Sequence, residues 1–105
     1  MTFIFMNKEN FDKLIKALKA KSYNIKFECH IFAGKLHIRG IYIYNTDNKN
    51  TIKSLIDKEI LKYIKLQNTL SWYLGERKEI ILLQFKEEIT LEIPEAESYG
   101  ISNLV

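Results

Sequence analysis

Residues 24–44 read Asn-Ile-Lys-Phe-Glu-Cys-His-Ile-Phe-Ala-Gly-Lys-Leu-His-Ile-Arg-Gly-Ile-Tyr-Ile-Tyr, two alternating runs on either side of a glycine. This pattern is typical of a β-hairpin with one buried and one solvent-facing side. Strand side chains alternate between faces, so their parity sorts them. The predicted buried face carries Ile25, Phe27, Cys29, Ile31, Leu36, Ile38, Gly40, Tyr42 and Tyr44. The predicted polar face carries Lys26, Glu28, His30, Lys35, His37 and Arg39.

The turn decides which residues of the two arms face each other. A loop of residues 34–35 places glycine first, as a type II′ turn requires, and puts His30 opposite Arg39. A loop of residues 33–34 puts His30 opposite His37 instead, but it needs alanine at positive φ, which is disfavoured. We therefore prefer the first loop, and the second stays open.

Two amphipathic helices are predicted, one on each side of this hairpin. The first is capped by Asn7, ends near residue 22 and has apolar residues at i, i+3, i+4 and i+7. The second is capped by Asn50 and runs to about residue 66. The first buried stripe is Phe11, Leu14, Ile15 and Leu18, and the second is Ile52, Leu55, Ile56, Ile60 and Tyr63.

Further strands are predicted before and after these elements. Residues 2–6 are wholly apolar, which suits a strand buried on both faces. Residues 69–75 fit either a helical extension or a strand. We favour the strand, because the helix would point Trp72 at water, which large aromatic side chains usually avoid.

The C-terminal part has two more apolar runs. Residues 79–85 and 89–93 are predicted strands, and the polar residues 86–88 either form a bend or lie within one long strand. Pro94 is expected to end the last strand. Residues 95–105 have no periodicity and are expected to form a loosely ordered tail.

Together these elements give the order β-α-β-β-α-β-β-β. We predict an α+β fold in which two amphipathic helices cover one face of a mainly antiparallel sheet. The first six elements match the ferredoxin-like arrangement, with additional strands at the C-terminus. A chain of 105 residues indicates one globular domain over residues 1–105.

Composition narrows the class of protein. Apolar residues make up 47% and charged residues 28%, values typical of soluble globular proteins. No apolar run approaches the roughly 20 residues of a membrane span, and the opening residues lack a basic leader. A single cysteine, Cys29, excludes an internal disulfide. We therefore expect a cytoplasmic protein without a membrane partner.

Charge is unevenly distributed along the chain. Residues 1–65 hold 13 of the 16 basic residues but only 6 of the 13 acidic ones. The C-terminal acids are expected to solubilise the strands and to discourage edge pairing. The basic part indicates either lysine-rich solvated helix faces or a nucleic-acid surface.

No motif for catalysis or phosphate binding occurs in the chain. Gly34-Lys35 is not followed by Ser or Thr, and neither Cys-x-x-Cys nor His-Glu-x-x-His is present. The candidate binding residues are those of the polar hairpin face: Lys26, Glu28, His30, Lys35, His37 and Arg39. Two facing histidines beside a carboxylate would suit a metal or acid–base chemistry. We expect ordinary cross-strand polar pairs instead, with no metal and no cofactor.

We therefore expect a non-enzymatic interaction protein with a protein partner. The many Lys, Ile and Asn residues indicate AT-rich coding DNA. Small proteins of AT-rich phages and plasmids often block host defence complexes, as anti-CRISPR proteins do, so a regulator or inhibitor of a host complex is the first hypothesis.

Two alternatives and one assembly state stay open. The chain would also suit an RNA- or DNA-binding module that uses helix lysines with Lys26, Lys35 and Arg39. A small nuclease that depends on His30 and His37 is the second alternative. An unpaired edge strand would allow a homodimer.

Overall fold

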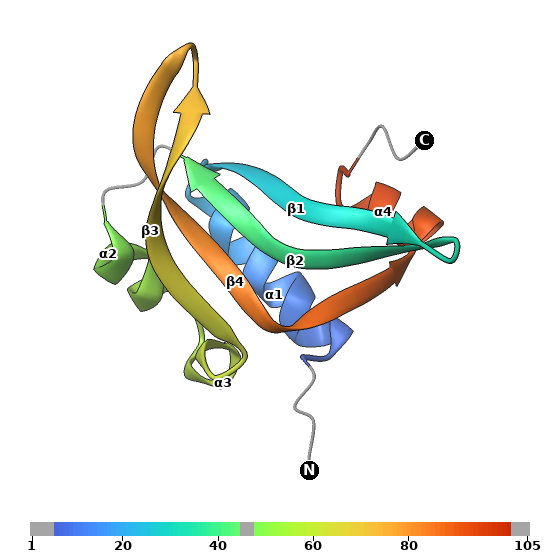
Figure 1. Ribbon diagram of the computed structural model, residues 1–105. Coiled ribbons are helices and arrows are strands. Elements are labelled where there is room, and N and C mark those ends of the chain that lie inside the picture. The colour runs from blue at the N-terminus through green and yellow to red at the C-terminus, as the bar shows by residue number, and fades with distance from the viewer. Residues whose placement is uncertain (1–5, 45–47, 102–105) are drawn as a thin grey trace.

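Figure 1 shows the computed structural model, in which residues 6–44 and 48–101 are described, apart from the side chain of Tyr73. These residues form an α+β fold, so the predicted fold class is confirmed. Four antiparallel strands make one open sheet in the order β1-β2-β4-β3. In chain order the elements are α1 (Lys8–Ala20), β1 (Asn24–Phe32), β2 (Lys35–Tyr44), α2 (Lys49–Leu55), α3 (Lys58–Leu61), β3 (Ile64–Tyr73), β4 (Glu76–Glu92) and α4 (Ile93–Ser98).

The ferredoxin-like arrangement is not confirmed. The sheet consists of two hairpins, β1–β2 and β3–β4, joined by pairing of β2 with β4. The first predicted strand lies outside the described residues except for Met6, which precedes α1 without pairing to the sheet. No helix in the described ranges has the length and apolar character needed to cross a bilayer.

Helix α1 matches its prediction and lies diagonally behind β2 and β4 in Figure 1. The Asn7 side chain accepts a hydrogen bond from the backbone N–H of Asn10 at 2.9 Å, as an N-cap does. The predicted stripe of Phe11, Leu14, Ile15 and Leu18 is fully buried. It packs in one core cluster with the inner face of the sheet, whose main residues are Leu36, Ile38, Ile41, Ile43, Ile81, Leu83, Ile89 and Leu91.

The predicted length of the second helix is wrong. Helix α2 is capped by Asn48 rather than Asn50 and ends at Leu55, and the short α3 follows. The break has a local cause: the Asp57 carboxylate accepts the backbone N–H of Glu59 at 2.9 Å, a capping bond that competes with a continuous helix. The chain then enters β3 at Ile64, where the apolar stripe had predicted helix.

Residues 69–73 belong to β3, so the preference for a strand is confirmed. The turn that follows contains Leu74 and Gly75, both at positive φ. The reason for that preference is wrong, however. The side chain of Trp72 is 71% exposed, because the strand continues beyond the helices that cover the inner face.

The β1–β2 turn also differs from the preferred prediction. Ala33 has φ 53° and Gly34 has φ 77°, so the loop is residues 33–34, and Phe32 pairs with Lys35. Two consecutive positive φ values are those of a type I′ turn, whose twist matches that of the strands. This match outweighs the cost of alanine in the left-handed region.

A β-bulge at Arg39 changes which residues of β2 face the core. Next to the turn Ile38 pairs with Cys29, but beyond the bulge Gly40 pairs with Glu28. The extra residue reverses the alternation of β2. The buried set therefore passes from Leu36 and Ile38 to Ile41 and Ile43, and Tyr42, predicted to be buried, lies half-buried on the outer face.

Strand β4 bends at the same place. Its 17 residues run through the polar segment 86–88, as one of the two alternatives predicted. Ile38 pairs with Ile89, and Gly40 pairs with Gln84. Between these two pairs β4 has three more residues than β2. Figure 1 shows the resulting bend midway along β4.

Helix α4 begins directly after β4, at the last residue of the predicted strand 89–93, and includes residues 95–98 of the segment that was expected to be a loosely ordered tail. Glu92 and Glu95 form a capping box, and Pro94 occupies the first turn, where its missing N–H costs nothing. Ala96 is fully buried in the core. The Tyr99 phenol donates a hydrogen bond to the Asp12 carboxylate of α1, so the described end of the chain is attached to the first helix.

Candidate functional site

The two histidines lie on the outer face of the sheet near the β1–β2 turn, where they are cross-strand partners. Their rings stack with centroids 5.1 Å apart. The His37 Nε2 lies 3.3 Å from the Phe32 carbonyl oxygen, and its Nδ1 lies 3.2 Å from the Thr90 hydroxyl oxygen. A carbonyl oxygen only accepts hydrogen bonds, so Nε2 carries the proton, and in the neutral ring Nδ1 accepts from Thr90.

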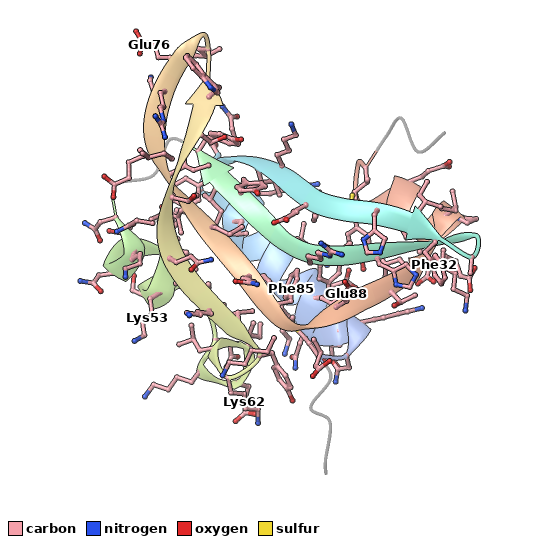
Figure 2. The ribbon with its side chains drawn as sticks, viewed as in Figure 1. Phe32, Lys53, Lys62, Glu76, Phe85 and Glu88 are labelled. Carbon is pink, nitrogen blue, oxygen red and sulfur yellow. The ribbon has the colours of Figure 1, made fainter. Side chains whose placement is uncertain are left out.

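The bend of β4 brings Glu88 to this cluster, as Figure 2 shows beside β2. The Arg39 Nε donates to Glu88 Oε1 at 3.1 Å, and the other oxygen of Glu88 lies 3.7 Å from His37 Nδ1. Lys35 Nζ lies 3.5 Å from a Glu92 carboxylate oxygen. Two of the predicted basic residues are thus neutralised by acids of β4.

Glu28 and Lys26 lie on the other side of the bulge, so the structure does not bring all six predicted residues together. Lys26 is exposed opposite Tyr42 in the ladder, and Glu28 pairs with Gly40. Burial, together with the charge of Glu28 and a hydrogen bond to it, raises the pKa of the Tyr42 phenol. Glu28 is therefore a partner of Tyr42 rather than of the histidines.

The histidine cluster has few free groups for chemistry. Across residues 6–44 and 48–101, no three His, Cys, Asp or Glu side chains are arranged to hold a metal ion. Both ring nitrogens of His37 already lie within hydrogen-bond distance of the chain's own oxygens. This ring offers no free base nitrogen to a substrate, whereas the ring of His30 is exposed.

The β3–β4 hairpin contains a second feature, which the sequence did not reveal. Residues 70–79, which we call the arm, extend past α2 and away from the rest of the sheet in Figure 1. The exposed fraction is 57% for Leu70, 71% for Trp72 and 81% for Leu74. Their alternation predicted that these residues share one face of a strand, but it did not show that this face is exposed to solvent.

A third feature is a groove between α2, α3 and β3 with a volume of about 550 Å³. We call it the α2–α3 groove. Figure 2 labels Lys53 on α2 and Lys62, the residue directly after α3. The lining residues are Lys49, Asn50, Lys53, Lys58, Leu61, Lys62, Ile64 and Leu66.

Comparison of the chain with protein-family models, with curated proteins and with solved structures gave no match. What the chain does must therefore be inferred from its own surfaces. Of the three features, the histidine cluster has most of its polar groups paired internally, whereas the arm and the α2–α3 groove present groups to solvent.

Proposed function

We propose that this chain is a non-enzymatic interaction protein that binds a protein partner through the arm. The supporting observation is the exposure of Leu70, Trp72 and Leu74 on one projecting hairpin. Tryptophan is among the residues that contribute most binding energy at protein interfaces. A two-stranded hairpin is only marginally stable alone, so burying these side chains in a partner would stabilise the arm as well as the complex.

Leu74 gives an independent reason. It has φ 52° and precedes Gly75 with φ 79°, the geometry of a type I′ turn in which asparagine is the favoured first residue. A leucine here is strained in the left-handed region and is also 81% exposed. Neither the turn nor the core gains from leucine, which fits a residue kept for contact with a partner.

The arm also indicates what the partner looks like. Trp72 pairs with Arg77 across the hairpin, so an indole and a guanidinium share one face. A partner with an apolar cleft and a carboxylate at its rim would match both groups. Such a cleft would bury the apolar side chains of the arm and pair Arg77 at its rim.

A second copy of this chain is a poorer match for the arm. The α2–α3 groove has four lysines among its described lining residues, and these would repel Arg77. We therefore propose a partner of different sequence. A regulator or inhibitor of a host complex, anti-CRISPR-like, is the biological role we propose for such binding.

Affinity capture from a low-GC bacterial lysate tests this proposal. The bait is the full chain, as wild type, as the arm variant Leu70→Ser/Trp72→Ser, and as the control Phe32→Ser. Phe32 is 68% exposed at the tip of the other hairpin in Figure 2, which makes it a matched apolar control. The partner should be retained by wild type and by the control and lost by the arm variant.

Reconstitution then checks the result with the purified partner. Trp72 is the only tryptophan, so its fluorescence should change from that of a water-exposed indole to that of a buried one on binding. The proposal is wrong if the arm variant captures the partner as well as wild type does. Light scattering of the free chain measures its oligomeric state. A dimer that the arm variant abolishes would show that the arm binds a second copy of this chain and not a different protein.

A further inference from the structure

We infer that the α2–α3 groove is a binding site for phosphate-rich anions, independent of the arm. Lysines make up four of its eight described lining residues, Lys49, Lys53, Lys58 and Lys62. The other four in this described set are Asn50 and three apolar residues, and none of the eight is a carboxylate. A concave surface lined by charge of one sign concentrates ions of the opposite sign.

These lysines are poorly neutralised by the protein itself. Of the four lysines, Lys62 forms an ion pair with Glu59 at 2.8 Å. Within the described ranges, no ion pair includes Lys49, Lys53 or Lys58. The first turn of α2 contains no acidic residue. Three ammonium groups at one groove therefore keep their attraction for an external anion.

The spacing of the lysines suits an anion with several charges. Lys49 and Lys53 are four residues apart on α2, which places their Cβ atoms roughly 5–6 Å apart. Lys58 is the first residue of the short α3, and Lys62 follows its last residue. The two pairs come from the two helical segments that border one groove, so a linear chain of phosphates would reach lysines of both segments.

The floor of the groove strengthens such pairing. Ile64 is buried, and Leu61 and Leu66 are half-buried, so apolar side chains lie beneath the ammonium groups. Charges interact more strongly near a low-dielectric surface than in open water. The volume of about 550 Å³ falls in the range of pockets that hold small ligands.

This location differs from the nucleic-acid surface expected from the sequence. Lys35 and Arg39 are paired with Glu92 and Glu88, so two of the three basic residues expected there, all but Lys26, already have an acidic partner. The helix lysines remain. Phosphates in the groove could come from a free polyphosphate or nucleotide or from the backbone of a single-stranded nucleic acid, which share the same chemistry.

Two titrations of the full chain test the inference. One uses tripolyphosphate and isothermal calorimetry, and the other uses a fluorescent oligothymidine and anisotropy at low and physiological salt. The test variant is Lys53→Gln/Lys58→Gln. The matched control is Lys16→Gln/Lys21→Gln, which removes the same charge from exposed positions of α1 and the residue after it.

The test variant should weaken binding about tenfold or more, and the control about twofold or less. With oligothymidine the slope of log K against log salt should flatten by roughly 1.4 when two phosphate contacts are lost. Preferential binding of tripolyphosphate identifies a free ligand, and preferential binding of oligothymidine identifies a strand. Circular dichroism confirms that both variants are folded, and Lys53→Glu alone repeats the test with a single change.

Three results would overturn the inference. The first is a Kd above about 1 mM for both probes at low salt. The second is an equal loss of affinity in the test and control variants, because this would mean diffuse attraction to a basic protein. The third is tighter binding of oligoglutamate than of tripolyphosphate, which would assign the groove to acidic peptides.

Discussion

His30 and His37 stack across the β1–β2 ladder with an interplanar angle of 17°, and only His37 is also connected to β4. Its Nδ1 lies near Thr90 and its Nε2 near the Phe32 carbonyl. His30, by contrast, is an exposed residue at the edge of the sheet. The stacked pair therefore has one member that supports the sheet and one that covers it from solvent.

Replacing these histidines one at a time should give unequal results. His37→Ala should lower the free energy of unfolding by about 1 kcal/mol, because two hydrogen bonds and the stacking contact are lost. His30→Ala should change it by about 0.5 kcal/mol or less. Urea denaturation measures both values, and an equal or larger cost for His30→Ala would contradict a supporting role for His37.

Changing Leu74 to asparagine should separate stability from binding. Leu74→Asn places the favoured residue at φ 52°, so the free energy of unfolding should rise by about 1 kcal/mol. The same change should weaken capture of the partner, because an exposed apolar contact is lost.

The control for this prediction is Ala33→Asn. Ala33 holds the same position in the other turn, with φ 53°. Ala33→Asn should raise the free energy of unfolding by a similar amount and leave capture of the partner unchanged. Thermal unfolding and the capture assay give both readouts, and loss of the partner with Ala33→Asn would count against the arm as the binding surface.

Gly40 is required because the bulge brings two strands close together. A Cβ atom on Gly40 would lie 2.7 Å from the Leu83 carbonyl oxygen, a backbone atom that moves only with the sheet. Gly40→Ala should therefore cost about 1–3 kcal/mol of unfolding free energy. Gly75→Ala is the control, since its new Cβ meets open space and its cost of about 1 kcal/mol comes from φ alone.

The comparison of Gly40→Ala with Gly75→Ala decides the cause. Chemical denaturation of both variants should place Gly40→Ala clearly below Gly75→Ala in stability. If Gly40→Ala is the milder change, the bulge tolerates a side chain, and the close approach of β2 and β4 does not explain the glycine.

Tyr99 should make stability fall at high pH. Burial first, and then the hydrogen bond to Asp12, raise its phenol pKa to about 12 from an ordinary value near 10. The unfolded chain loses this proton at lower pH than the folded chain. The contribution is therefore complete below about pH 10 and is lost as pH rises from about 10 to 12.

The variant Tyr99→Phe has no phenol to ionise at this position, so it does not lose this contribution to stability at high pH. The difference in urea midpoint between wild type and Tyr99→Phe should shrink as pH rises through this window. Other tyrosines and the lysines titrate in both proteins, so the difference isolates Tyr99. A difference that is constant with pH would show that the phenol is not linked to folding.

Local patterns in the sequence predicted those helices and strands that form through contacts between residues close in sequence. The stripe of α1 from Phe11 to Leu18 is buried as expected, and the alternation of residues 24–44 produced a hairpin. The strand at residues 69–73 followed from the same alternation. In each case the partners needed to form the element lie close in sequence.

Features set by distant pairing could not be predicted in this way. The bulge at Arg39 is matched by extra residues of β4, whose bend also brings Glu88 to Arg39, 49 residues away in sequence, and to within 3.7 Å of His37. The break at Asp57 had a local signal, an acid two residues before Glu59, but the helical stripe outweighed it. The exposure of Trp72 depends on where the helices stop, which alternation does not encode.

The pairing of β2 with β4 also determines how the chain folds. The other two ladders join strands that are adjacent in sequence, whereas this one joins residues 35–43 to residues 81–92 across α2, α3 and β3. Contacts of such sequence separation carry the largest loop-closure entropy and slow folding. Two hairpins should therefore form early and meet late, so that in stopped-flow experiments Leu83→Ala slows refolding while substitutions at the hairpin tips mainly accelerate unfolding.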